Sequence, residues 1–124
     1  MDSPLHSSHG VHYLLECSGC MPELLESAPL LEKTMEQAAR SAGATVVKTV
    51  IHGFNPIGLS GVVIIAESHI AIHCWPEQAY AAIDIFTCGD AKIAERIYQN
   101  ILTAFEPHSH SCQKLERRPP AVTT

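Results

Sequence analysis

The side chains of this sequence best suited to chemistry surround a polar interruption between two apolar runs. Glu67, Ser68 and His69 form the interruption. It separates residues 62–66 from residues 70–72, and both runs are rich in β-branched residues, which favour extended backbone. The hydroxyl of Ser68 can attack the carbonyl just before it, that of Glu67, if the peptide is strained and the oxyanion is stabilised. A buried serine bonded to the backbone is the plainer interpretation.

Two further side chains can move protons near this serine. His73 follows Ser68 by five residues, and an unperturbed imidazole titrates near ~6.5, which suits a base that takes a carbon-bound proton near neutral pH. Cys88 follows an apolar run and precedes Gly89, so its thiol can be partly exposed and can deliver a proton. A core histidine and a small buried cysteine are the alternatives.

The residues around these groups carry a family resemblance. The chain reads Glu-Ser-His at residues 67–69, Ile-His-Cys-Trp-Pro-Glu at 72–77 and Ala-Ala-Ile-Asp-Ile-Phe-Thr-Cys-Gly at 81–89. Over roughly residues 10–102 it resembles the prokaryotic S-adenosylmethionine decarboxylase proenzymes. The resemblance implies that the bond between Glu67 and Ser68 cuts itself and that Ser68 becomes a pyruvoyl group.

The resemblance also implies the roles of the neighbouring residues. The ester formed from Glu67 onto Ser68 undergoes β-elimination, assisted by His73 and Ser60, and the dehydroalanine at position 68 hydrolyses to pyruvoyl. The pyruvoyl group then forms a Schiff base with the substrate amine, which accepts the electrons left by departing carbon dioxide. Cys88 is the implied proton donor to the decarboxylated carbon. Pyridoxal phosphate is the usual alternative, but no lysine looks placed for it.

Three residues match family positions that line the substrate site, namely Phe54, Trp75 and Glu77. Aromatic surfaces suit an adenine ring or a sulfonium cation, and a carboxylate suits ribose hydroxyls. Simple packing is the alternative for the two aromatic residues. Ile57 and Gln78 stand where tyrosine is common in the family, which is a departure near the substrate site.

The resemblance therefore favours S-adenosylmethionine as the substrate, and its decarboxylated product is the aminopropyl donor for spermidine. Relatives of this family decarboxylate arginine or ornithine, and these two amino acids stay open as alternatives.

A metal or redox site is a competing interpretation. Cys17 and Cys20 have the C-x-x-C spacing, and His108, His110 and Cys112 offer further ligands. A lone C-x-x-C is a weak signal without a second matching pair. The main interpretation therefore has no metal.

Charge and composition limit the classes of partner that this chain can bind. The formal net charge is -5 with only 8 Lys and Arg residues, which argues against a nucleic-acid partner. No apolar run approaches the ~18 residues of a membrane helix, and the N-terminus lacks a signal-peptide pattern. We expect a cytoplasmic protein that does not bind membranes. Its five cysteines are then expected to be free thiols without disulfides.

The strands and helices that must position these groups are predicted from the spacing of apolar residues and from the Gly, Pro and capping residues between them. Strands are predicted over residues 11–17, 44–52, 62–66, 70–72 and 80–87, with at most one short strand at 113–117. Gly19 and Pro22 are expected to close the first strand. Helices are predicted from a cap at Ser27 to Gly43, and over residues 91–105, where Ile93, Ile97, Ile101 and Phe105 form a buried stripe.

This order predicts an α+β two-layer sandwich, a mostly antiparallel sheet with two helices on one face. We expect one domain over residues 11–117, with mobile tails at 1–10 and 118–124. The uncovered face of such an apolar sheet favours a face-to-face homodimer, which the resemblance implies too.

Overall fold

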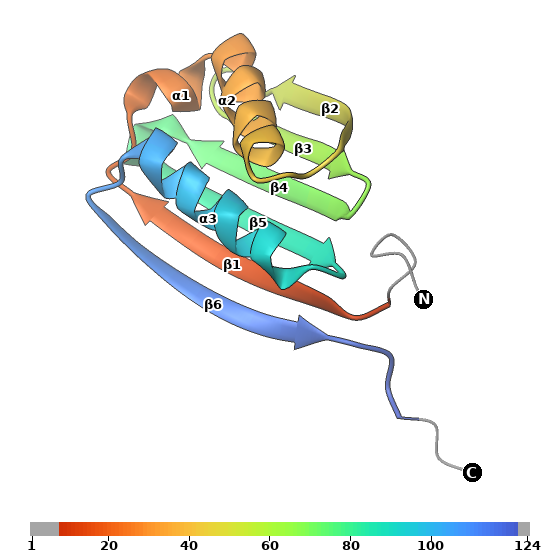
Figure 1. The fold of residues 1–124 in the computed structure, drawn as a ribbon. Helices are drawn as coiled ribbons and strands as arrows, with labels where there is room; N and C mark the ends of the chain where they lie inside the picture. Colours follow the sequence, from red (N-terminus) through yellow and green to blue (C-terminus); the bar gives the residue numbers. More distant parts are fainter. Residues whose placement is uncertain (1–7, 122–124) are drawn as a thin grey trace.

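A computed structural model describes residues 8–121 of the chain. Within this range six strands form one sheet in the order β2-β3-β4-β5-β1-β6, and every neighbouring pair is antiparallel. The strands are β1 (Gly10–Ser18), β2 (Val46–Gly53), β3 (Leu59–Ile65), β4 (Ser68–Trp75), β5 (Tyr80–Cys88) and β6 (Ser109–Arg117). The helices are α1 (Pro22–Glu26), α2 (Ala28–Ser41) and α3 (Ala91–Phe105), and they cover the same face of the sheet (Figure 1). The predicted α+β two-layer sandwich is confirmed.

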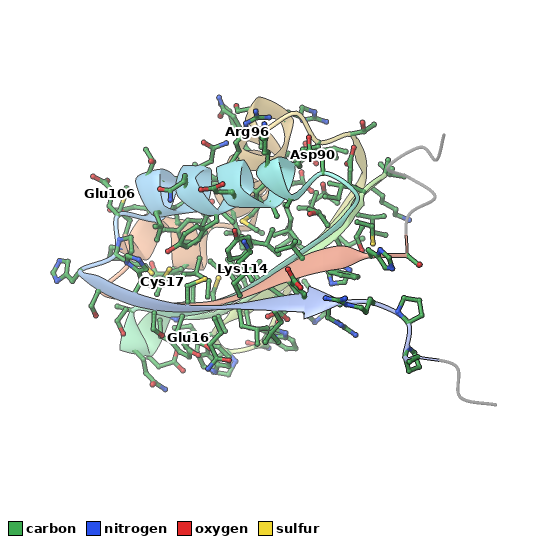
Figure 2. The ribbon with its side chains drawn as sticks, turned by 60° about the horizontal axis from the view of Figure 1, so that its bottom comes forward. Glu16, Cys17, Asp90, Arg96, Glu106 and Lys114 are labelled. Carbon is green, nitrogen blue, oxygen red and sulfur yellow. The ribbon has the colours of Figure 1, made fainter. Side chains whose placement is uncertain are left out.

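The core lies between the sheet and the helices, and strand alternation decides which residues enter it. In β4 the side chains of Ile70, Ile72 and Cys74 are buried, whereas His73 and Trp75 are exposed. Figure 2 shows the same alternation in β1, with Cys17 on the side of α3 and Glu16 on the other side of the sheet. We call the side without helices the open face.

The two predicted helices begin at side-chain caps. Ser27 Oγ accepts a hydrogen bond from the backbone N–H of Leu30 (3.2 Å), and Asp90 Oδ1 accepts one from the N–H of Lys92 (2.9 Å). The predicted stripe of α3 packs into the core through Ile97, Ile101 and Phe105, with Ala94 in place of the half-buried Ile93.

Four elements differ from the prediction. The strands predicted over residues 62–66 and 70–72 are longer, β3 being Leu59–Ile65 and β4 Ser68–Trp75, so Ser68 and His69 belong to β4. Pro22 does not merely close the first strand but opens the short helix α1, where proline is tolerated at the first position and where Leu24 and Leu25 are buried. The last strand is longer than expected, because β6 pairs with the whole of β1, from Ser18 opposite Ser109 to Gly10 opposite Arg117. Its residues are almost all exposed at a sheet edge, so its sequence lacks an apolar signal.

The polar interruption is a hairpin turn. Ala66 and Glu67 form a two-residue turn between β3 and β4, and Ser68 is the first residue of β4. The Glu67–Ser68 bond therefore lies at one end of the sheet. Among residues 8–121 no helix is long and apolar enough to cross a membrane.

Candidate active site

The carbonyl of Glu67 already has a hydrogen-bond donor. The backbone N–H of Cys88 donates to the Glu67 carbonyl oxygen at 2.8 Å. Ser68 follows directly, is half-buried and has extended backbone, with φ of 159°. A fixed N–H aimed at a carbonyl oxygen is the type of group that stabilises the charge of a tetrahedral oxyanion. The arrangement thus supplies the two components an acyl shift needs, a neighbouring hydroxyl and an oxyanion donor.

The side chain of Glu67 holds the turn in place. It is 8% exposed, and its Oε1 accepts a hydrogen bond from the backbone N–H of Thr45 at 3.1 Å. The N–H of Ala66 donates in turn to the Thr45 carbonyl oxygen at 2.8 Å. Both bonds tie the hairpin turn to the residue just before β2, so the Glu67–Ser68 bond has little freedom to move.

Cys88 ends β5 at the same end of the sheet. Its thiol is free and half-buried. Gly89 follows with φ of +94°, a conformation that glycine adopts without strain, and its N–H donates to the His9 carbonyl oxygen at 3.1 Å. The chain then turns into α3, so the thiol stays at the sheet end beside the Glu67–Ser68 bond.

The remaining predicted residues line a cleft of about 350 Å³ at the other end of the sheet. Its lining consists of Phe54, Ile57, Gly58, Leu59, Ser60, His73, Cys74, Trp75 and Glu77. Ser60 and His73 form a hydrogen bond there, with 2.7 Å between Ser60 Oγ and His73 Nδ1. The structure therefore joins the two predicted processing residues to the predicted substrate residues.

Aromatic rings form one wall of this cleft. The Trp75 ring stacks on Tyr80, with centroids 4.9 Å apart and planes at 13°, and lies 6.0 Å from the His73 ring. Tyr80 donates a hydrogen bond of 2.6 Å to Glu16 Oε1, and this bond, more than burial, raises the pKa of Tyr80 to about 12. The phenol therefore stays neutral and holds Trp75 in position. The sequence interpretation missed Tyr80, although a β4–β5 hairpin would have placed it opposite Trp75.

Phe54 belongs to the loop that follows β2. Its N–H donates to the Gly58 carbonyl oxygen at 2.8 Å, and its ring meets the edge of the His52 ring at 4.7 Å. The Phe54 side chain is 53% exposed, so it is available to a ligand. Of the two departures from the family pattern, Ile57 lines the cleft, whereas Gln78 lies in the 3₁₀ helix η2 (Pro76–Gln78) outside the lining.

The two groups of residues are far apart within one chain. Ser68 begins β4 and His73 lies five residues further along it, a distance of about 17 Å at the rise of a β-strand. Ser60, opposite His73 in the register, is equally distant from the hairpin turn. One end of the sheet thus carries Glu67, Ser68 and Cys88, and the other carries the cleft with His73.

The C-x-x-C pair has no matching ligands. Cys17 and Cys20 are buried, and the Cys20 thiol donates to the Cys17 carbonyl oxygen at 3.5 Å. A hydrogen bond between the two thiols, followed by burial, raises the pKa of the Cys17 thiol and disfavours its thiolate, whereas the same bond lowers the pKa of the Cys20 thiol. The pair therefore does not offer two thiolates to a metal. His110 bonds instead to the Tyr98 hydroxyl at 3.3 Å. In the described part of the chain no three His, Cys, Asp or Glu side chains are grouped to hold a metal.

This chain is similar to known proteins in sequence and in fold. The family model described as S-adenosylmethionine decarboxylase matches residues 11–118. Two relatives named S-adenosylmethionine decarboxylase proenzyme come from Thermodesulfovibrio yellowstonii (44% identical, covering 87% of this chain and 80% of that protein) and Parasynechococcus marenigrum (39%, covering 91% and 88%).

A solved structure is also similar. The crystal structure of the adenosylmethionine decarboxylase from Aquifex aeolicus superposes with a TM-score of 0.85 at 31% identity, covering 95% of this chain and 98% of that one. With a family model that spans the sheet and all three helices, this chain belongs to the S-adenosylmethionine decarboxylase family.

Proposed function

We propose that this chain cuts itself between Glu67 and Ser68 and then acts as a pyruvoyl-dependent decarboxylase of S-adenosylmethionine. The observation that carries the proposal is the 2.8 Å hydrogen bond from the Cys88 N–H to the Glu67 carbonyl oxygen, because it activates the one carbonyl that Ser68 can attack. The names of the relatives support the substrate. The catalytic unit is residues 11–117.

Self-cleavage uses groups of this chain. Ser68 Oγ forms a bond to the Glu67 carbonyl carbon, the peptide C–N bond breaks, and the nitrogen of residue 68 takes the serine proton. The Cys88 N–H holds the negative charge on the Glu67 oxygen meanwhile. His73 then removes the α-proton of residue 68 while the Glu67 carboxylate leaves. In the tautomer that we assign to His73, Nδ1–H donates to Ser60 Oγ and Nε2 is left free as the base.

The elimination leaves a dehydroalanine at position 68, whose imine tautomer takes up water and releases ammonia to give a pyruvoyl group, and the residues at the hairpin fit that group. The group supplies an electron sink when the carboxylate of the substrate is lost. Cys88 donates the proton that replaces the carboxylate, because its half-buried thiol lies at the same sheet end as residue 68. Phe54 and Trp75 hold the purine or the sulfonium, and Glu77 accepts hydrogen bonds from ribose hydroxyls.

A homodimer brings the two ends of the sheet together. His73 cannot reach Ser68 of its own chain across about 17 Å, so a second copy must supply it. The open face offers the surface, since Val50, Val62, Ile64 and Leu115 on it are each at least 40% exposed. Single exposed apolar residues are ordinary, but Val50 and Val62 lie opposite each other in β2 and β3 with Ile64 on the same face, and adjacent exposed apolar side chains indicate a protein interface.

Two-fold symmetry gives the dimer two equivalent sites. When two open faces pack about a two-fold axis that lies between them, runs perpendicular to the strands and passes the middle of β4, the hairpin end of one copy meets the cleft end of the other. Two equal sites result, each with Ser68 and Cys88 from one chain and Ser60, His73, Phe54, Trp75 and Glu77 from the other. The five free thiols fit a reducing compartment such as the cytoplasm.

An intact-mass spectrum tests self-cleavage. The purified protein should separate into chains of residues 1–67 and 68–124, the second starting with a carbonyl that reacts with hydrazide reagents. Ser68→Ala should stay one chain. A wild-type protein that shows only the uncut mass after long incubation, with no carbonyl labelling, would contradict the proposal.

Release of labelled carbon dioxide tests the substrate. Carboxyl-labelled S-adenosylmethionine, arginine and ornithine are compared on the processed protein. A cleft with Glu77 aimed at ribose should prefer the nucleoside at least ~10-fold, because arginine and ornithine leave that carboxylate unpaired. Turnover of either amino acid with none of S-adenosylmethionine would reject the substrate and leave the self-cleavage intact.

A further inference from the structure

One buried hydroxyl beside the hairpin has no hydrogen-bond partner. Thr87 in β5 is 1% exposed, and its Oγ1 finds no partner in the described residues. Most buried hydroxyl groups in folded proteins are paired, because burial without a partner costs free energy that valine at the same position would not cost. An unpaired threonine in this position therefore needs an explanation.

The register places this hydroxyl next to the reacting serine. Thr87 is directly opposite Ser68 in the antiparallel pairing of β4 with β5. Side chains at directly opposite positions have Cβ atoms about 4.5–5.5 Å apart, a span that two short hydroxyl side chains can bridge. The next residue, Cys88, supplies the N–H that holds the Glu67 carbonyl oxygen. Two neighbouring residues of β5 thus face the two reacting groups of the hairpin.

We propose that Thr87 is a positioning residue for self-cleavage. Its Oγ1 accepts a hydrogen bond from the Ser68 hydroxyl in the reactive conformation and directs a lone pair of Ser68 Oγ at the Glu67 carbonyl carbon. Thr87 takes no proton, since the serine proton ends on the nitrogen of residue 68 as the C–N bond breaks and the Oγ–C bond forms. This inference rests on the self-cleavage proposed above.

A packing role for Thr87 makes the opposite prediction. If only the shape of the side chain matters, Thr87→Val keeps the branched side chain, removes an unpaired buried hydroxyl and is harmless or stabilising. Thr87→Ser then removes a buried methyl group, leaves a small cavity and is the damaging change. The two variants separate a hydroxyl that positions Ser68 from a methyl that fills space.

The experiment follows the cleavage rate from newly folded protein by intact mass. Thr87→Val should slow the appearance of the chain of residues 68–124 about tenfold, the effect of losing one orienting hydrogen bond. Thr87→Ser should cleave at nearly the wild-type rate. Thr49→Val makes the same change in β2, away from the hairpin, and should leave the rate unchanged.

A second measurement separates folding from cleavage. Each change is also made in a Ser68→Ala chain, which cannot cut itself, and the melting temperature is recorded. We expect Thr87→Val to melt at or above the temperature of its parent, so that slow cleavage cannot be ascribed to misfolding. Equal cleavage by wild type and Thr87→Val, or slow cleavage by Thr87→Ser alone, would overturn the role of Thr87. Absence of cleavage in wild type would instead reject the proposed self-processing.

Discussion

At the scale of single residues, Cys88 has two separable proposed functions. Its backbone N–H holds the Glu67 carbonyl oxygen at 2.8 Å, whereas its thiol is the proposed proton donor during turnover. A side-chain substitution removes the second function and keeps the first. The same residue can therefore be tested for each stage independently.

Cys88→Ala should cut itself at the normal rate and lose turnover by ~100-fold or more, the usual contribution of a positioned acid. Intact mass reports the first quantity, and carbon dioxide release reports the second. Cys88→Ser is the matched control for side-chain volume. Loss of cleavage in Cys88→Ala would show that the thiol, and not only the backbone, takes part in processing.

At the scale of the elements, the hairpin turn is held by a carboxylate rather than by a turn glycine. Glu67 Oε1 accepts from the Thr45 N–H, and Ala66 donates to the Thr45 carbonyl. Glu67 thus helps to hold the turn through its side chain, in addition to carrying the carbonyl of the proposed attack.

Glu67→Ala should destabilise the chain by about 1 kcal/mol through the lost hydrogen bond, whereas Glu67→Gln keeps an oxygen acceptor and should cost less. Urea unfolding at fixed protein concentration measures both, in the uncleavable Ser68→Ala background. Cleavage should also slow in Glu67→Ala, because the scissile bond gains freedom. Equal stability of the alanine and glutamine variants would show that the hydrogen bond of the Glu67 side chain does not stabilise the turn.

The elements also show how much the sequence alone could predict. The strands with alternating apolar residues and the capped helices were predictable, because burial on one face leaves a periodic pattern. Helix α1 was missed because Pro22 indicates a helix start and a strand end equally well. The edge strand β6 was predicted too short because its residues are mostly exposed. Periodicity does not indicate Tyr80 or Thr87, because the contact of Tyr80 with Trp75 and the proposed role of Thr87 depend on pairing register, which periodicity does not determine.

At the scale of the whole molecule, the open face carries a charged aromatic cluster. His12, His69, Phe86 and Arg117 form it, with 5.3 Å between the His12 and Phe86 rings and 3.2 Å between His12 Nδ1 and Arg117 Nη1. Burial lowers the pKa of His12, with smaller lowering by Arg117 and His69 and an opposing effect of Asp84. Packing a second sheet on this face would bury His12 further.

The sign of the pH dependence follows from this lowered pKa. Burial in the dimer would lower the pKa of His12 below that of the free protomer, so the dimer is fully stabilised above the protomer's pKa and weakens as the pH falls towards the lower pKa of His12 in the dimer. The dimer should therefore dissociate several-fold more readily at about pH 5.5 than at about pH 7.5. Sedimentation equilibrium measures this, and His12→Gln should reduce the difference. A dimer of equal strength at both pH values would contradict the assignment.

The proposed site shared by two chains predicts the behaviour of single variants. His73→Ala alone should stop at the ester, because the acyl shift needs Ser68 and the Cys88 N–H but the elimination needs a base. Hydroxylamine should then cut that ester at residue 67. Ser68→Ala alone should stay uncut.

Mixed dimers of these two variants should regain processing. In such a dimer the Ser68→Ala chain supplies an intact His73 to the intact Ser68 of the His73→Ala chain, if the open faces pack as proposed. Co-expression with two different affinity tags isolates the mixed dimer, and intact mass should show the pyruvoyl chain derived only from the His73→Ala partner. If purified mixed dimers remain at the ester stage, His73 acts on Ser68 of its own chain. That result would contradict the proposed dimer, which rests on the separation of about 17 Å between the two residues within one chain.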